Sequence, residues 1–229
     1  MISKIRLKLT VVMLLSMLTA WAEHDSAVKV ICMGASITEG HGTVCPPTDA
    51  FPAKLGEFLG EGYAVTNFGA GGTTMLKNGN YPYWEKGPLD KALASAPDIV
   101  IIDLGGNDSK AMNRPYMDEF VSDACDMVSR FKSLPSSPRV ILLTPIVSFV
   151  KDSNDIWDEC IVNDVAPRVV EAAIRSGVEV IDMHPVLDCY PELMPDGIHP
   201  DNIGAKMMAK YIYDYLRKPP DKPTSPGKK

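Results

Sequence analysis

The sequence predicts an α/β fold built on a parallel sheet of five strands that is covered by helices on both sides. Short apolar runs rich in β-branched residues alternate along the chain with segments in which apolar residues recur at helical spacing. The clearest run, residues 98–104 (DIVIIDL), is nearly continuous in apolar residues, as expected for a strand that is buried on both faces. Strands that alternate with helices pair in parallel, because each crossover returns the chain to the same edge of the sheet.

Five runs fit this pattern of strands. Each is short, rich in Val and Ile or in aromatic residues, and followed by helical or glycine-rich sequence. The expected strands are residues 28–33, 63–67, 98–104, 139–143 and 178–182.

Helical patterns separate and follow these runs. One carries an apolar stripe from Met117 to Phe131, and another ends at Gly177, since glycine readily adopts the left-handed conformation that closes a helix. No internal repeat or interior linker divides the chain, so we expect one domain over residues 23–218 and a flexible, Pro- and Lys-rich tail over 219–229. The expected helices are residues 51–59, 115–131, 156–176 and one that begins near Asp201.

The first 22 residues are typical of a secretory leader. Three basic residues precede an apolar run over residues 9–18, and the sequence AWA, which ends at Ala22, has small residues where signal peptidase cleaves. The run is shorter than the about 20 residues that span a bilayer. An uncleaved N-terminal anchor is the alternative. We therefore expect a signal peptide over residues 1–22 and a protein exported to the periplasm or the extracellular space.

Composition and charge exclude several classes of protein. The 229 residues are 45% hydrophobic and 23% charged, which is ordinary for a folded chain and unlike a disordered or collagen-like one. The formal net charge is −6, and loss of the leader, with its three basic residues, makes it −9. Since no basic stripe offsets this charge, we expect neither a nucleic-acid partner nor a membrane span.

The five cysteines do not define a disulfide framework. Cys32 lies in an apolar strand and Cys125 on the apolar side of a helix, so both are expected in the core. Cys45, Cys160 and Cys189 lie in or near loops and could pair in an oxidising compartment, but their spacing does not select a pair. The chain has no CxxC motif and no His-Cys cluster, so we expect no metal and no cofactor.

Polar, glycine-rich segments follow the strands. In an open parallel sheet, ligands bind beyond the carboxyl ends of the strands, where these segments meet. One such segment alone is weak evidence, but four at one edge predict a site. They are residues 34–40 (GASITEG), 67–72 (NFGAGG), 105–108 (GGND) and 196–200 (DGIHP).

Together these segments supply the groups that acyl transfer needs. Ser36 would be exposed at a tight strand-to-helix turn, and His199 is the candidate base that takes its proton. Asp196 lies three residues before His199, close enough to orient the imidazole. The N–H groups of Ser36 and Gly69 and the side-chain amide of Asn107 could stabilise an oxyanion. Ordinary alternatives are a helix cap for the serine, a loop residue for the histidine and a turn brace for the asparagine.

The four segments, in this order, resemble the signature blocks of the SGNH/GDSL hydrolase superfamily. The similarity extends from Val28 to about Leu216. It implies a three-layer α/β/α sandwich with a flavodoxin-like, five-stranded parallel sheet. It also implies a Ser-His-Asp triad of Ser36, His199 and Asp196, with Gly69 and Asn107 completing the oxyanion hole that the Ser36 amide begins.

One departure from the family pattern concerns Ala35, which stands where the family usually has Asp. That Asp is not a triad member, so the chemistry is not excluded. The Gly-Ala-Ser-Ile-Thr version resembles bacterial sialate- and xylan-type O-acetylesterases, which implies a serine esterase that removes acetyl groups from small or oligosaccharide esters. The alternatives are an acyl-thioesterase or lysophospholipase for longer chains, and a non-catalytic carbohydrate-binding module with a relic site.

Substrate contacts are expected from residues near these segments. His41 lies five residues after Ser36 and could line the mouth of the pocket, or it could be a solvated loop residue. Tyr83 and Trp84, together with Tyr81, could stack on a sugar ring, or they could cover the core beneath a long loop. Asp108 is expected to anchor its loop rather than to join the chemistry.

Overall fold

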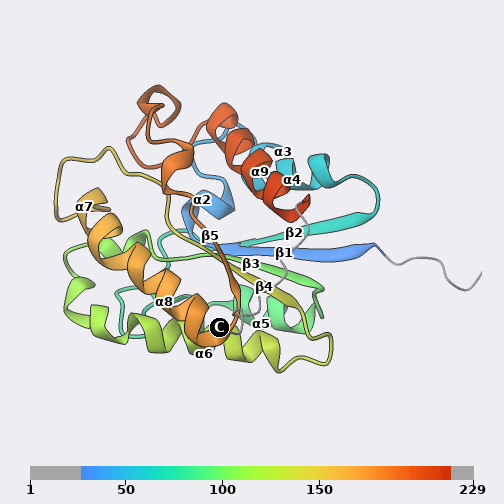
Figure 1. Ribbon diagram of the computed structural model, residues 1–229. Helices are drawn as coiled ribbons and strands as arrows, with labels where there is room; N and C mark the ends of the chain where they lie inside the picture. Colours follow the sequence, from blue (N-terminus) through green and yellow to red (C-terminus); the bar gives the residue numbers. More distant parts are fainter. Residues whose placement is uncertain (1–26, 218–229) are drawn as a thin grey trace, which may run out of the picture.

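The computed structural model describes residues 27–217, which form one sheet of five parallel strands between two layers of helices (Figure 1). The strand order is β2-β1-β3-β4-β5, and every pair is parallel. The predicted leader and the whole of the predicted tail lie outside the described residues. The strands are β1 (Val28–Gly34), β2 (Tyr63–Gly69), β3 (Ile99–Asp103), β4 (Arg139–Leu143) and β5 (Glu179–Ile181).

The two faces of the sheet are buried in separate hydrophobic clusters. Alternate side chains of β1 point to opposite faces, so Ile31 and Met33 lie in one cluster while Val30 and Cys32 lie in the other. The first cluster is completed by α5 (Gly87–Ala94), α6 (Phe120–Lys132) and α8 (Ala166–Ser176), and the second by α4 (Phe51–Leu59) and α9 (Asn202–Arg217) (Figure 1). The prediction of a three-layer α/β/α sandwich is therefore confirmed.

The helices differ greatly in length. Two of them agree closely with the predictions, because α4 spans the expected residues and α9 begins one residue after Asp201. Several short helices lie in the loops at the carboxyl edge. The helices are α2 (Ser36–Glu39), α3 (Pro46–Asp49), α4 (Phe51–Leu59), α5 (Gly87–Ala94), α6 (Phe120–Lys132), α7 (Asp158–Cys160), α8 (Ala166–Ser176) and α9 (Asn202–Arg217).

Two expected helices are not continuous. The segment expected as one helix from Pro115 begins as a 3₁₀ helix (Arg114–Glu119) and becomes α6 only at Phe120. The segment expected over 156–176 begins two residues later, as α7, and passes through a π-helical stretch (Ile161–Val165) before α8. Pro167, near the start of α8, has no N–H to donate to the preceding turn, and this interrupts the regular ladder there.

The sequence patterns did not predict α5. It is only eight residues long, begins with Gly87-Pro88, and buries just Leu89 and Ala92, so its apolar stripe is too short to recognise.

The cysteines are all free in the structure. Cys32 lies in the core, as predicted, and Cys125 packs against the core while remaining partly accessible. Cys160, expected in or near a loop, is instead buried at the end of α7, whereas Cys45 and Cys189 are exposed. Within residues 27–217, no helix is long and apolar enough to cross a membrane.

The carboxyl ends of β1, β2 and β3 are level with one another. Gly34 pairs with Gly69 on one side and with Asp103 on the other. A Cβ on Gly69 would lie 2.2 Å from the backbone nitrogen of Glu39 and 2.5 Å from its Cα, so α2 rests directly on the end of β2. This contact requires a glycine and fixes the short helix that Ser36 begins.

We therefore expect the substitution Gly69→Ala to destabilise the protein by about 1–3 kcal/mol, because the added methyl group overpacks a rigid backbone contact. Urea unfolding of the purified protein measures this change. Gly62→Ala is the matched control, since a Cβ there meets no atom within 4 Å. Equal stability of the two variants would contradict the packing role of Gly69.

Candidate active site

Ser36 begins α2 directly after β1, at the carboxyl edge of the sheet. Its side chain is nearly buried, with 9% of the residue exposed, yet it lines both cavities described below. The N–H group of Ser36 has no backbone or side-chain acceptor among residues 27–217. Both the hydroxyl and the amide of this residue are therefore available to a ligand.

Ser36, His199 and Asp196 form one hydrogen-bonded array. The Nε2 atom of His199 lies 2.8 Å from Ser36 Oγ, and its Nδ1 atom lies 2.6 Å from Asp196 Oδ2. Since the carboxylate accepts the proton on Nδ1, Nε2 is left to accept the proton of the serine hydroxyl. The three residues predicted as a triad thus lie in the order that general-base activation of a serine requires.

Asp196 is held by the turn that also carries His199. Its Oδ1 atom accepts the backbone N–H groups of Ile198, at 2.9 Å, and of His199, at 2.7 Å. Partial burial acts to raise the pKa of Asp196, but hydrogen bonds from the His199 ring and from these two amides lower it overall. The carboxylate therefore stays ionised at neutral pH, and the 54% exposure of its side chain to water also favours the charged form.

The structure gives Gly69 a different role from the one predicted. Its N–H donates to Asn67 Oδ1 at 2.8 Å, so this amide is already paired and its expected place in an oxyanion hole is not supported. Gly72 also lines the cleft, and its N–H has no hydrogen-bond acceptor among the described residues. Because Gly69, Gly71 and Gly72 lie within four positions, the sequence alone does not indicate which of their amides lacks an acceptor.

Asn107 lies in a 3₁₀ turn (Asn107–Ser109) just beyond β3, and it lines both cavities together with Ser36. Its side chain is almost fully buried, and Nδ2 donates one hydrogen to the carbonyl of Thr73 at 3.1 Å. Since the amide has two hydrogens, one remains for a ligand. Asp108, beside it, accepts the N–H groups of Met75 and Leu76, which confirms the prediction that it anchors a loop.

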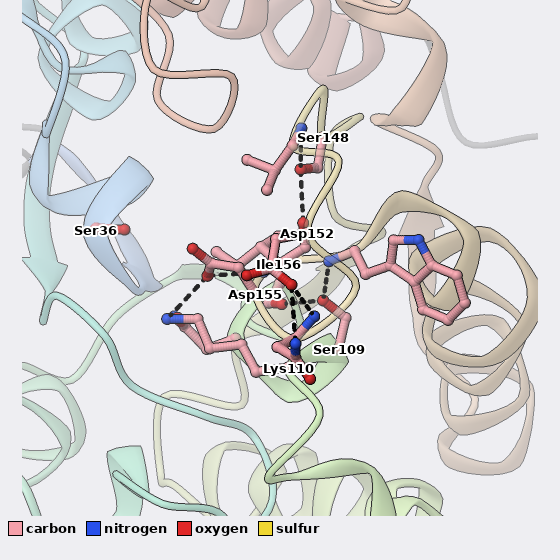
Figure 2. Close-up of polar contacts among 12 residues, drawn as sticks. Ser36, Ser109, Lys110, Ser148, Asp152, Asp155 and Ile156 are labelled. Carbon is pink, nitrogen blue, oxygen red and sulfur yellow. Dashed lines mark hydrogen bonds and ion pairs between the residues drawn. The ribbon is translucent and has the colours of Figure 1, made fainter.

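A small cavity of about 30 Å³ opens beside Ser36. A water molecule needs roughly 10–15 Å³ of such a cavity, so the space holds a group the size of about two or three waters. The loop between β4 and α7 forms one wall, and Figure 2 shows it across from Ser36. The lining residues are mostly apolar: Ala35, Ser36, Ile37, Asp103, Gly106, Asn107, Pro145, Ile146, Val147, Ser148, Ile156, Ile161 and Ile198.

A much larger cleft of about 700 Å³ meets the small cavity at Ser36. His41 lines it, as predicted, with its ring centroid 5.5 Å from that of His199. Tyr81 also lines it and is 44% exposed, and the Nζ atom of Lys86 lies 3.6 Å from the centroid of its ring. Lys110 and Asp155, which the sequence did not single out, complete its polar wall.

The expected sugar contacts of Tyr83 and Trp84 are wrong. Tyr83 is fully buried, its hydroxyl donates to the carbonyl of Phe68, and burial raises its pKa. Trp84 packs against the core, and its Nε1–H donates to the carbonyl of Met75 at 2.7 Å. The alternative interpretation, that these rings cover the core, is the correct one.

The geometry of the site matches one class of protein. A serine, a histidine and an aspartate joined in this order, beside amides that have no acceptor, form the arrangement by which serine hydrolases cleave acyl bonds. No group of three or more His, Cys, Asp or Glu side chains is placed to hold a metal ion in residues 27–217.

The chain belongs to the GDSL-like lipase/acylhydrolase family, whose model matches residues 32–207. It is 37% identical over 209 residues to an acetylxylan esterase of Xylanibacter ruminicola, an alignment that covers 83% of this chain. The same alignment covers only 43% of that relative, so the chain spans less than half of its length. The predicted superfamily is thereby confirmed.

Solved structures share the fold. A carbohydrate acetylesterase from Sinorhizobium meliloti, Est24, has a TM-score of 0.67 at 22% identity, covering 82% of this chain and 98% of the other. An aryl esterase of M. smegmatis has a TM-score of 0.66 at 20% identity, covering 83% and 99%. A two-domain esterase active on acetylated mannans has a TM-score of 0.61 at 19% identity, covering 88% of this chain and 52% of its own.

The buried Asp103 makes stability depend on pH. Burial raises its pKa to about 6, and the hydrogen bond from Thr38 Oγ, at 2.8 Å, only partly opposes this. The folded state therefore holds its proton more tightly than the unfolded state does. This contribution is fully present below about pH 4 and is lost as the pH rises through about 6.

We expect Asp103→Asn to remove this dependence, because asparagine keeps an acceptor for Thr38 but cannot ionise. The wild-type free energy of unfolding should fall relative to that of the variant, by up to about 3 kcal/mol between pH 4 and pH 7. Chemical denaturation at several pH values measures the difference. Parallel pH profiles for the two proteins would contradict the assignment.

Proposed function

We propose that the protein is a serine esterase that removes acetyl groups from carbohydrates through an acyl-enzyme. The observation that carries this proposal is the meeting of two unequal cavities at Ser36. The small apolar cavity fits an acetyl methyl group, while the wide polar cleft has room for one or more sugar rings. A long-chain thioesterase or lysophospholipase would need an extended apolar channel where this chain has about 30 Å³.

In the proposed mechanism, Ser36 Oγ attacks the ester carbonyl carbon while His199 Nε2 accepts its proton. Asp196 keeps the imidazole in the required tautomer and stabilises the imidazolium. The tetrahedral intermediate collapses when His199 protonates the departing sugar oxygen, leaving acetyl-Ser36. Water, activated by the same histidine, then attacks the acetyl group and releases acetate.

We propose that the Ser36 amide, the Asn107 side chain and the Gly72 amide stabilise the oxyanion, with Gly72 in place of Gly69. Support comes from the availability of these donors: Ser36 and Asn107 line both cavities, and Gly72 lines the cleft beside them. Fixed donors in a site shielded from water are effective because they need no reorganisation as the charge develops.

The substrate class follows from the cleft and from the relatives. The cleft wall has an exposed tyrosine ring, Tyr81, which could stack on a sugar face. The acetylxylan esterase relative supports an acetylated polysaccharide or its fragments as the substrate. From the leader pattern, we propose that the enzyme acts outside the cytoplasm, where such polymers occur. Nothing in this mechanism calls on a cofactor.

The replacement Ser36→Ala should abolish acetate release from acetylated xylan and from 4-nitrophenyl acetate, since no other group in the array can attack the ester. Enzymatic assay of acetate, with circular dichroism to verify folding, tests this. Ser122→Ala, at an exposed serine of α6, is the control and should keep full activity. Undiminished turnover in a folded Ser36→Ala protein would refute the proposal, and the carbohydrate-binding module would then be the better description.

Asn107→Ala should lower kcat by about 100- to 1000-fold with little change in KM, as is typical for loss of one oxyanion donor. Steady-state kinetics on 4-nitrophenyl acetate separate the two constants. The control is Asn78→Ala, which removes an exposed asparagine whose side chain donates to Glu119 on the surface. A rise in KM at constant kcat would show that Asn107 binds the substrate without stabilising the transition state.

A further inference from the structure

The small cavity and the cleft share four residues: Ser36, Asn107, Ile156 and Ile198. The first two are polar, so the apolar partition between the two spaces consists of two isoleucines. Ile198 lies inside the turn that carries Asp196 and His199, where its position is tied to that of the triad. Ile156 lies on a separate loop, between β4 and α7, and is 7% exposed. Ile156 is therefore the residue of the partition that can be substituted without changing the turn that carries Asp196 and His199.

Polar contacts on both sides hold the backbone of Ile156 in place (Figure 2). Ser148 Oγ donates to the carbonyl of Ile156 at 2.7 Å, and the N–H of Ile156 donates to Asp155 Oδ1 at 2.8 Å. The Asp155 carboxylate in turn pairs with Lys110 Nζ at 3.6 Å. An isoleucine with its backbone fixed at both ends forms a rigid wall rather than a mobile lid.

The next residue is anchored to the turn that carries Asn107. Ser109 Oγ accepts the N–H of Trp157 at 3.0 Å and donates its own hydrogen to the carbonyl of Gly106 at 2.7 Å. Ser109 is fully buried, so this serine joins the loop to the turn without water in between. One 3₁₀ turn thus positions both the proposed oxyanion donor and the wall of the small cavity.

We propose, on the basis of the proposed esterase function, that Ile156 sets the acyl-chain length the enzyme accepts, and that Ser109 is the residue that positions it. Acetyl fits the space beside Ser36, and each further methylene of the acyl chain meets the side chain of Ile156. Truncating that side chain widens the small cavity toward the cleft. Longer acyl groups are then accommodated, while the triad and the oxyanion donors are untouched.

The test is a series of kcat/KM values for 4-nitrophenyl acetate, propionate, butyrate and hexanoate, expressed as the ratio of butyrate to acetate. Ile156→Ala should raise this ratio by about tenfold or more, in line with the effect of one methylene in an apolar pocket. Ile156→Val should raise it less. Ser109→Ala should also raise the ratio, because the wall loses its anchor. A loss of stability alone would lower kcat/KM for both esters without changing their ratio.

Two controls match these changes. Ile212→Ala truncates a fully buried isoleucine of α9 and should leave the ratio unchanged. Ser95→Ala removes a hydroxyl that, like that of Ser109, donates to the carbonyl three residues earlier, but that lies at the C-terminal end of α5. It should also leave the ratio unchanged.

The outcomes separate this inference from the function on which it rests. A wild type that prefers acetyl, with an unchanged ratio in folded Ile156→Ala, overturns the inference alone. If that variant does not fold, an unchanged ratio in Ile156→Val does so instead. A wild type that fails to hydrolyse the acetyl ester, or that prefers hexanoate, contradicts the proposed function itself and the inference with it.

Discussion

Beyond their first one or two residues, β1, β3 and β4 are buried on both faces of the sheet, since their side chains alternate between two buried clusters. Parallel strands need a crossover after each of them, and the crossover helices supply the apolar surface that covers both faces. This burial leaves only the ends of these three strands accessible. The turns that follow β1, β2 and β3 are therefore brought together at one edge, where Gly34, Gly69 and Asp103 lie side by side. The position of the candidate site follows from how the sheet is covered.

Much of this arrangement could be predicted because it depends on local patterns. All five strands were expected within a few residues of their bounds, and the segments with Ser36, Asn107 and His199 were expected to meet at one edge. Local patterns did not predict the features that depend on tertiary packing. Pro167 interrupts a helix whose apolar stripe continues across it, and α5 buries too few side chains to produce a visible stripe.

The candidate site shows the same limit at the scale of single atoms. The glycine-rich segment at the end of β2 predicts available amides, but only the structure shows that the Gly69 amide is paired with Asn67. Tyr81 and Tyr83 lie two residues apart and look alike in sequence. One lines the cleft and the other is fully buried, because the extended backbone ends at Pro82 and Tyr83 begins a 3₁₀ helix (Tyr83–Glu85), so the two rings do not share one side of an extended segment. Cavity volumes depend on residues from distant segments and leave no local signal.

A backbone hydrogen bond joins the loop between β4 and α7 to the loop that carries Asp196 and His199. The N–H of Phe149, in the loop that carries Ile156, donates to the carbonyl of Gly197, between Asp196 and His199. This hydrogen bond couples the two loops, so an opening that separates Phe149 from Gly197 also loosens the loop that carries His199. Amide hydrogens on both loops would then exchange with solvent through the same opening event. An opening of the wall beside the acyl group would then also displace His199, so proton transfer from Ser36 would stop until the loops closed again.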